Sequence, residues 1–359
     1  MQVKKKSMTA QERMEALLNY NKPDRVPLGN QSQSHGFNTK NLGYTPAEAY
    51  DDPERSFHSY LKTSEQYGWD QILQVYFLTV LGTLDFGGEV RLPKGEYEGA
   101  ALITVSYPVK TEKDIENLRI PDPKTSGLIP KAMQFAECQE AHGLSPGFFS
   151  RSPFVMAANI CGLDLFLKWT IKKPELCKHL IKMSMDHIFN VLSYWIERFG
   201  PDKVLVWMSS PIESNQLISP KLFEKLALPS HVEYHERLKS LGITQFALHI
   251  CGDQNLNLPY LSEASPWRHP SVLSFGHEVD IGVAAKYFPE DIIYGNINPV
   301  AFLMETPQQI YELCKEAIEK GKKAPGGFIL STGCEISPST PPEKLHAMTK
   351  AVNDFGWYN

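Results

Sequence analysis

The sequence lacks three features that would each place the protein in a particular class. It has no excess of basic residues, because 36 Lys and Arg stand against 41 Asp and Glu in 359 residues, for a formal charge of −5. It has no uninterrupted apolar stretch of the roughly 20 residues that a membrane-spanning helix needs, and no apolar run follows Lys4–Lys6 to make a signal peptide. We therefore expect a cytoplasmic protein whose partners include neither nucleic acid nor a membrane.

Cysteine is also sparse, which makes the individual cysteines informative. The six residues are widely scattered, and in a chain of this length such scatter favours free thiols or metal ligands over a disulfide framework. Cys138, Cys177 and Cys314 lie within helical patterns, where free cysteine usually packs as a small hydrophobic side chain. Cys251 and Cys334 instead follow strand-like runs, so these two are the candidates for chemistry.

The order of the predicted elements indicates an α/β fold. Helical patterns cover residues 9–20 and 46–66, and from residue 147 onward strand-like runs alternate with helical patterns, as in a parallel sheet covered by helices. We expect a single (β/α)8 TIM barrel over residues 1–359, in which residues 1–110 include an N-terminal extension and a β-rich insertion. A doubly wound sheet is the alternative, but no Gly-x-Gly-x-x-Gly motif follows a first strand.

Several predicted strands end in polar or metal-binding residues, which is where a TIM barrel places its active site. His249 and Cys251 are separated by one residue, so both side chains point to the same face of a strand. Cys334 ends another strand pattern, and barrel geometry brings the two ends to a common mouth. Two thiolates and an imidazole suit zinc, with one position left for substrate. The alternative is that all three are small buried residues.

Motifs spread over nearly the whole chain resemble the uroporphyrinogen decarboxylase superfamily. They are Glu12-Arg13, Lys22–Pro27, His249–Gly252, Gly295–Pro299 and Gly327–Cys334. The decarboxylases of this superfamily carry an arginine-rich loop early in the chain, whereas residues 29–35 here contain no arginine. The His-x-Cys…Cys set instead resembles that of the zinc-dependent, corrinoid-linked methyltransferases.

This resemblance implies a TIM barrel, bound zinc and the transfer of a methyl group from a small methylated substrate to the Co(I) of a corrinoid. The sequence contains no Asp-x-His-x-x-Gly motif, so the cobalamin-type corrinoid would be supplied by a partner protein. Relatives with the same ligands work in the reverse sense, from a methylcobamide to a thiol such as coenzyme M. The resemblance also implies an acidic fourth zinc ligand, for which Glu213 is the first candidate and Glu335 the second.

Residues near other strand ends are candidates for contact with the substrate. Phe148 and neighbouring aromatic residues would suit an aryl methyl ether, and the polar stretch from Asn30 to His35 would bind ring hydroxyl groups. Asn296 would hydrogen-bond the substrate. The ordinary alternatives are a core aromatic residue for Phe148 and a turn at the Asn-Pro sequence beside Asn296.

His277 and Glu278 follow a further predicted strand, where either would donate a proton to the leaving oxygen or orient a ligand, unless they are simply an exposed loop pair. Together these residues predict the methyltransferase of an O-demethylase system, acting on a methoxyaromatic substrate with a corrinoid protein. The alternatives are a methylcobamide:thiol methyltransferase, a decarboxylase of a smaller acid anchored by Arg151 or Arg25, and a non-catalytic barrel that holds zinc. The oligomeric state stays open, with a homodimer among the alternatives.

Overall fold

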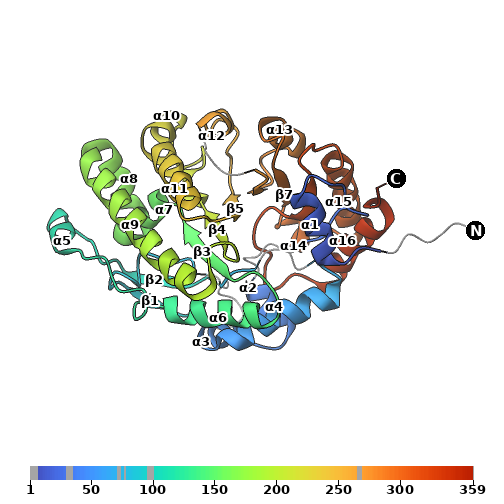
Figure 1. Ribbon diagram of the computed structural model, residues 1–359, viewed down its shortest axis with the longest axis horizontal. Helices are drawn as coiled ribbons and strands as arrows, with labels where there is room; N and C mark the ends of the chain where they lie inside the picture. The colour runs from blue at the N-terminus through green and yellow to red at the C-terminus, as the bar shows by residue number, and fades with distance from the viewer. Residues whose placement is uncertain are drawn as a thin grey trace, which may run out of the picture.

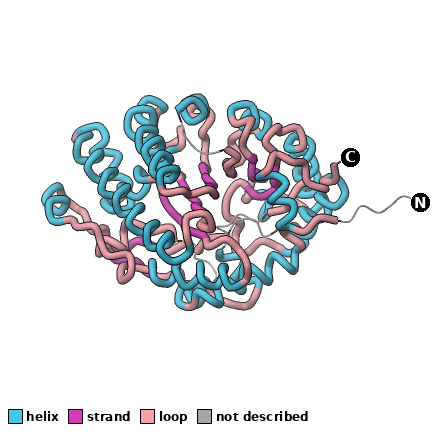
Figure 2. Tube along the Cα trace, in the orientation of Figure 1, coloured by secondary structure: helices cyan, strands magenta, loops and turns pink. Residues whose placement is uncertain are grey.

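A parallel sheet forms the centre of the computed structural model, which describes residues 7–29, 35–70, 74–76, 78–94, 101–264 and 269–358 (Figure 1). Its six strands pair in chain order, and each connection passes through at least one helix. Figure 2 shows the helices arranged around these strands, as in a TIM barrel. The strands are β3 (Gly147–Arg151), β4 (Leu205–Ser209), β5 (Gln245–Ile250), β6 (Val272–Phe275), β7 (Ile292–Ile297) and β8 (Phe328–Thr332).

The helices fall into an N-terminal group and a group that covers the sheet. The first group is α1 (Ala10–Leu18), α2 (His35–Asn41), α3 (Pro46–Asp51), α4 (Pro53–Tyr67), α5 (Glu112–Asn117) and α6 (Ile129–Ala141). The second is α7 (Pro153–Cys161), α8 (Leu163–Lys172), α9 (Pro174–Phe199), η1 (Pro211–Glu213), α10 (Pro220–Leu222), η2 (Phe223–Ala227), α11 (Leu228–Ser240), α12 (Leu258–Ala264), α13 (Ile281–Tyr287), α14 (Ala301–Met304), α15 (Pro307–Gly321) and α16 (Pro342–Phe355).

Local sequence signals explain where the first helices begin and end. Thr9 caps α1 in a capping box with Glu12, since each side chain bonds the backbone N–H of the other. The helix expected over residues 46–66 is in fact two helices, α3 and α4, which meet at Asp52. Pro53 explains the break, because a residue before proline is disfavoured in the helical region, and Asp52 is extended with φ −121° and ψ 97°.

A small antiparallel sheet lies beside the barrel, within the stretch expected to form a β-rich insertion. β1 (Glu89–Arg91) pairs with β2 (Ile103–Ser106), and these strands make no pairing with the central sheet. Figure 1 places the pair near α5, away from the strand ends that carry the predicted metal ligands. The small sheet is therefore an elaboration of the barrel's outer surface.

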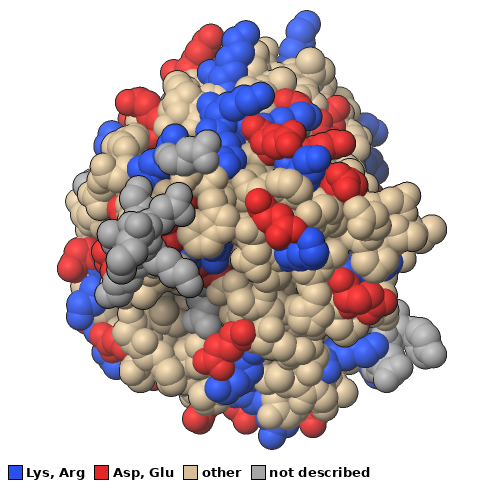
Figure 3. Space-filling model, turned by 90° about the vertical axis from the view of Figure 1, so that its right-hand side faces the viewer, with Lys and Arg blue, Asp and Glu red and all other residues tan. Residues whose placement is uncertain are grey.

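Within the described residues, no single helix combines the length and the apolar character needed to cross a membrane. The helices α7 and α8 reach that composition only when taken together across a bend of 110°. Most residues of α7 are buried inside the protein. On the face shown in Figure 3, acidic and basic side chains of the described residues are interspersed, in keeping with the nearly balanced composition.

The segment around Leu28 extends the central sheet beyond β8. Leu28 forms a parallel bridge with Leu330. The two segments are joined by hydrogen bonds from Gly29 N–H to Leu330 O (2.8 Å) and from Leu330 N–H to Pro27 O (3.0 Å). A chain segment more than 300 residues distant in the sequence thus completes this edge of the sheet.

A buried ion cluster holds that N-terminal segment in place. The carboxylate of Asp70, with only 3% of its side chain exposed, lies 2.8 Å from the guanidinium of Arg13 and 2.9 Å from that of Arg25. It also accepts the backbone N–H of Leu28 at 2.8 Å. Arg25 is therefore committed to the structure of the N-terminal segment and is not an anchor for a substrate.

We expect Asp70→Asn to lower the free energy of unfolding by about 3–5 kcal/mol, because it leaves the buried guanidinium of Arg25 without its counter-charge and leaves Arg13 paired with Asp24 alone. The measurement is the urea-denaturation midpoint. Asp51→Asn is the matched control, since Asp51 pairs with Lys131 at the surface and 83% of its side chain is exposed. That variant should keep the wild-type midpoint. A wild-type midpoint for Asp70→Asn as well would show that the cluster does not stabilise the fold.

Candidate metal centre

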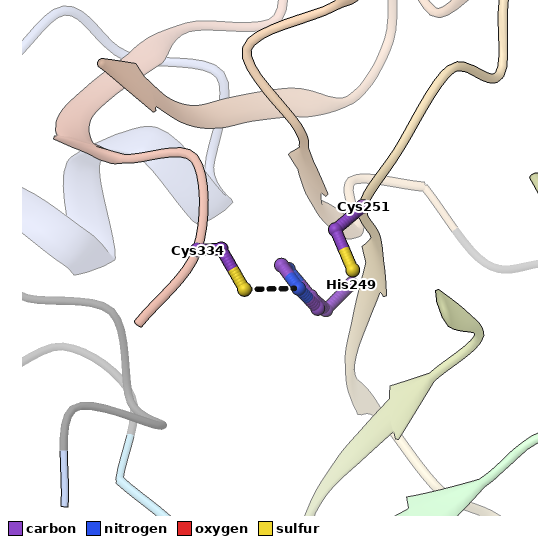
Figure 4. A group of neighbouring side chains, drawn as sticks. All are labelled: His249, Cys251 and Cys334. Atoms are coloured by element: carbon purple, nitrogen blue, oxygen red, sulfur yellow. Dashed lines mark hydrogen bonds between the residues drawn. The ribbon is translucent and has the colours of Figure 1, made fainter. Parts of the chain in front are cut away.

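Three side chains from two separate strands meet at the carboxyl end of the sheet. His249 lies at the end of β5, Cys251 directly follows that strand, and Cys334 follows β8 (Figure 4). One potential ligand atom from each residue lies within 4.8 Å of the other two, and Cys334 Sγ is 3.8 Å from His249 Nε2. We call these residues the His-Cys-Cys triad. It is the one such group of His, Cys, Asp and Glu among the residues that the structure describes.

The parallel register fixes the orientation of the histidine. His249 is paired with Ser209 on β4 and with Ser274 on β6, so these side chains form a row across three strands. The Nδ1 atom of the fully buried imidazole lies 2.9 Å from the hydroxyl oxygen of Ser274. This contact leaves Nε2 facing Cys334, which is the arrangement by which a second residue orients a metal-binding histidine.

The two thiols influence each other's ionisation. The pKa of Cys334 is lowered, because its thiolate accepts a hydrogen bond from Cys251 and lies beside His249. The same hydrogen bond, together with burial, raises the pKa of Cys251. The thiolate is the form that binds metals, and a site that already favours one thiolate is suited to a cation. Two sulfur atoms and one imidazole nitrogen match the donor set of a catalytic zinc site.

The remaining buried cysteines are chemically different. Burial raises the pKa of Cys161 and of Cys177 to about 12, and it also raises that of Cys314. These thiols lie in helices α7, α9 and α15. They are therefore protonated members of the hydrophobic core.

The two acidic candidates for a fourth ligand are placed differently. Glu213 is fully buried, with Oε2 2.6 Å from His231 Nε2 and Oε1 accepting a hydrogen bond from Ser152, so the structure does not bring it into the triad. Glu335 adjoins Cys334, and its Oε1 atom is buried without a hydrogen-bond partner among the described residues. Burial, and then the nearby Cys334 thiolate, raise the pKa of Glu335 to about 8.

The other residues predicted near strand ends form contacts among the loops. His277 Nδ1 lies 3.4 Å from Glu278 Oε2, and 41% of the His277 side chain is exposed. Asn296 donates both hydrogen bonds of its amide to backbone carbonyls, at 2.9 Å to Gly276 and 2.6 Å to Val279. The Asn296 amide therefore ties the end of β7 to the loop after β6.

The structure places Phe148 and the described part of the N-terminal polar stretch in different surroundings. Phe148 packs edge-on against Trp195 of α9, with ring centroids 5.5 Å apart, and so faces the helical layer. Side chains alternate along a strand, so Phe149 lies on the opposite face. Asn30 lies outside the described residues. His35 is fully buried, and burial lowers its pKa to about 4, which keeps the imidazole neutral.

A group of buried polar side chains lies near the triad, and its members are far apart in the sequence. His35 lies with its ring centroid 4.6 Å from that of Tyr50, and Tyr50 is within electrostatic range of both Arg151 and Glu335. We call these four residues the polar cluster. Arg151 and His35 were already candidates, whereas nothing in the local sequence of Tyr50 distinguishes it from a core tyrosine.

Glycines allow the loops that carry Cys251 and Cys334 to pack against one another. A Cβ atom on Gly333 would lie 2.9 Å from the backbone nitrogen of His277. One on Gly276 would lie 2.8 Å from the nitrogen of Gly252 and 3.2 Å from the Cα of Cys251. Real Cβ atoms essentially never come within 3.0 Å of such atoms, so the position of both cysteines depends on the absence of side chains here.

A comparison with solved structures identifies the fold. A methyltransferase from Methanosarcina mazei has a matching solved structure, with a TM-score of 0.80, 22% sequence identity and coverage of 97% of this chain and 99% of that one. At this level of identity the match establishes the fold, which is a TIM barrel as the sequence predicts.

The sequence comparisons then define the family. The pattern described as "Uroporphyrinogen decarboxylase (URO-D)" matches residues 9–355, so the chain belongs to the uroporphyrinogen decarboxylase family. A methylcobamide:CoM methyltransferase MtaA of Methanosarcina barkeri is 24% identical over 356 residues, covering 97% of this chain and 98% of the relative. A methylated-thiol–coenzyme M methyltransferase of Methanosarcina mazei is 27% identical over 205 residues, which are 56% of this chain and 51% of that relative's length.

We expect the purified protein to bind about one zinc ion per chain and Cys334→Ala to lose it, because two remaining ligands do not make a tight site. The measurement is metal content after dialysis against a weak chelator. Cys138→Ala is the matched control, since Cys138 is a half-buried thiol on α6. Zinc retained in full by Cys334→Ala would remove Cys334 from the ligand set.

Gly333→Ala should weaken zinc binding by about tenfold or more although it leaves every ligand in place, since the added Cβ displaces the loop that carries Cys334. Competition with a chromophoric chelator measures the affinity. Gly282→Ala is the control, because its Cβ meets only the Asp280 side chain at 3.1 Å. Equal affinities of the two variants would show that the loop contact does not position the ligand.

Proposed function

We propose that this protein is a zinc-dependent methyltransferase that moves a methyl group between a small methylated substrate and the cobalt of a corrinoid held by a partner protein. The His-Cys-Cys triad carries the proposal, because its three donors converge at the carboxyl end of a barrel sheet, where catalytic residues of this fold lie. The names of the relatives, both of them methyltransferases, support the same chemistry.

The triad is suited to hold the metal in a defined geometry. Cys251 and Cys334 would supply thiolates and His249 its Nε2 atom, while Ser274 holds the other ring nitrogen. Bound zinc would polarise the oxygen or sulfur atom that exchanges the methyl group. When Co(I) attacks the methyl carbon, the bond from carbon to that heteroatom breaks and its electron pair stays on the heteroatom. The reverse transfer uses the same atoms in the opposite order.

Two classes of substrate are compatible with this site. An aryl methyl ether is supported by the buried aromatic rings near Glu335, where Tyr50 lies 6.0 Å from Tyr76 and His35 lies 6.2 Å from Tyr60, centroid to centroid. A thiol is supported by the names of the relatives, each of which refers to coenzyme M. The two differ in the atom that the metal would activate, so one pair of assays separates them.

The first assay combines the zinc-loaded protein with cob(I)alamin and a methoxybenzoate, and the second combines it with methylcobalamin and a small thiol. Free cobalamin replaces the partner protein in both. We expect methyl transfer in at least one assay, and a rate at least about 100-fold lower for His249→Ala, because a catalytic metal contributes several kcal/mol to the barrier.

Cys138→Ala is again the matched control and should keep the wild-type rate. Absence of methyl transfer in both assays by a fully zinc-loaded protein would contradict the proposal. Release of carbon dioxide from the methoxybenzoate would instead favour the alternative that the protein is a decarboxylase. A rate unaffected by His249→Ala would show that the triad does not take part.

A further inference from the structure

The loop that follows β5 contains two fully buried amide side chains, Gln254 and Asn257. A buried amide is costly unless its polar atoms are hydrogen-bonded. Asn257 Nδ2 donates to Gln254 Oε1 at 2.8 Å, and Gln254 Nε2 donates to the carbonyl oxygen of Cys251 at 3.2 Å. The two amides therefore reach one member of the triad through its backbone, where the chain leaves β5 (Figure 4).

Asn257 also joins this loop to the one that follows β4. Its Nδ2 atom donates a second hydrogen bond to the carbonyl oxygen of Glu213 at 2.9 Å, and its Oδ1 atom accepts from Asn215 Nδ2 at 3.0 Å. The two loops are in close contact nearby, since a Cβ atom on Gly252 would lie 2.8 Å from the Cβ of Ser214. The position of the β5 loop therefore depends on the position of the β4 loop.

The side chain of Glu213 fixes the β4 loop to two helices. Its Oε2 atom lies 2.6 Å from Nε2 of His231 on α11. Its Oε1 atom accepts a hydrogen bond from Ser152, the residue that caps the N-terminus of α7. All three side chains are fully buried, so a carboxyl group without these partners would be strongly unfavourable at this position. Glu213 thus lies outside the triad because its oxygens are bonded to the helical layer.

These contacts form a continuous path, which we call the Glu213 network, from Glu213 through Asn257 and Gln254 to Cys251. Both carboxyl oxygens of Glu213 and every nitrogen and oxygen of the two amide side chains have a partner along it. A buried network whose polar atoms are paired in this way favours a single arrangement of the loops it joins.

The other cysteine of the triad is held by a shorter contact of the same kind. The hydroxyl of Thr332 donates to the carbonyl oxygen of Cys334 at 2.7 Å. A side-chain donor thus binds the backbone carbonyl of each cysteine just beyond its strand. For Cys334 the donor is two residues away, whereas for Cys251 the bond belongs to a network that extends to α7 and α11.

We propose that Glu213, Asn257 and Gln254 are positioning residues, which hold the Cys251 thiol where a metal ion bound by His249 and Cys334 requires it. This inference rests on the proposed function, because it concerns the metal of that site. A loop ordered in advance loses little conformational freedom when the metal binds, so the affinity is higher. Glu213 would therefore raise the affinity for the metal without touching it.

Zinc affinity, measured by competition with a chromophoric chelator, tests this inference. Asn257→Leu and Gln254→Met remove hydrogen bonds of the Glu213 network at nearly constant side-chain size. Each should weaken zinc binding about tenfold or more, as the loss of contacts that orient a metal ligand does. Asn190→Leu is the matched control and should keep the wild-type affinity, since Asn190 is an exposed amide on α9 that bonds only the carbonyl of Pro121 among the described residues.

The absorption spectrum of the cobalt(II)-substituted protein separates positioning from a general loss of stability. We expect the thiolate-to-cobalt band of metal-saturated Gln254→Met to be shifted or weakened, because the Cys251 sulfur no longer lies in its wild-type position. A variant that is merely less stable would keep the wild-type spectrum once saturated. The thermal midpoint of the metal-free proteins shows which variants fold, and Gln254→Met serves as the test if Asn257→Leu does not.

Two variants of Glu213 distinguish a positioning residue from a metal ligand. Glu213→Gln still offers polar atoms to both His231 and Ser152, so it should bind zinc within about threefold of the wild type. Glu213→Leu loses both contacts and should bind as weakly as Asn257→Leu. An equal loss of affinity in the two Glu213 variants would identify the carboxylate as a ligand and overturn the inference.

Wild-type affinity and an unchanged cobalt spectrum in both Asn257→Leu and Gln254→Met would also overturn the inference, while leaving the proposed function intact. Absence of zinc binding by the wild-type protein would overturn the two together. The wild-type measurement therefore shows which of the two has failed.

Discussion

The rest of the site depends on the parallel pairing of β4, β5 and β6. This register places Ser209, His249 and Ser274 in one row, so the imidazole is hydrogen-bonded to a residue of one neighbouring strand and shares its face with a residue of the other. A shift of the pairing register of β5 by one residue would turn the His249 side chain outward to the helices. The orientation of this candidate metal ligand is therefore set by the backbone pairing of the sheet.

The loops above the sheet impose a second constraint, which is steric. Cys251 and Cys334 lie after strands, where no ladder of backbone hydrogen bonds fixes them. Their positions are set by close contacts at Gly276 and Gly333 and by the amide of Asn296, which joins the end of β7 to the loop after β6. Parallel strands thus fix one member of the triad and packed loops fix the other two. Loops of this kind can differ among relatives of the same fold, whereas the strands supply a rigid support.

The sequence was most informative where a pattern is local. The helical pattern over residues 9–20, the strand-then-helix alternation and the His-x-Cys spacing each depend on neighbouring residues, and each pointed to a feature that the structure contains. Glu213 shows the limit, because its position after a strand gave no sign that His231 and Ser152 would occupy its oxygens. Such pairings join distant segments, and only the folded chain brings them together.

The triad also brings together residues from two strands, β5 and β8, that are not neighbours in the sheet. Cys251 and Cys334 are 334 − 251 = 83 residues apart, and β6 and β7 lie between the strands that they follow. A metal held by both would act as a removable cross-link that closes a long chain loop, at an entropic cost that grows only slowly with loop length. A zinc ion bound by both cysteines would therefore also link the ends of β5 and β8 across one half of the barrel. Its removal would loosen the sheet as well as the site.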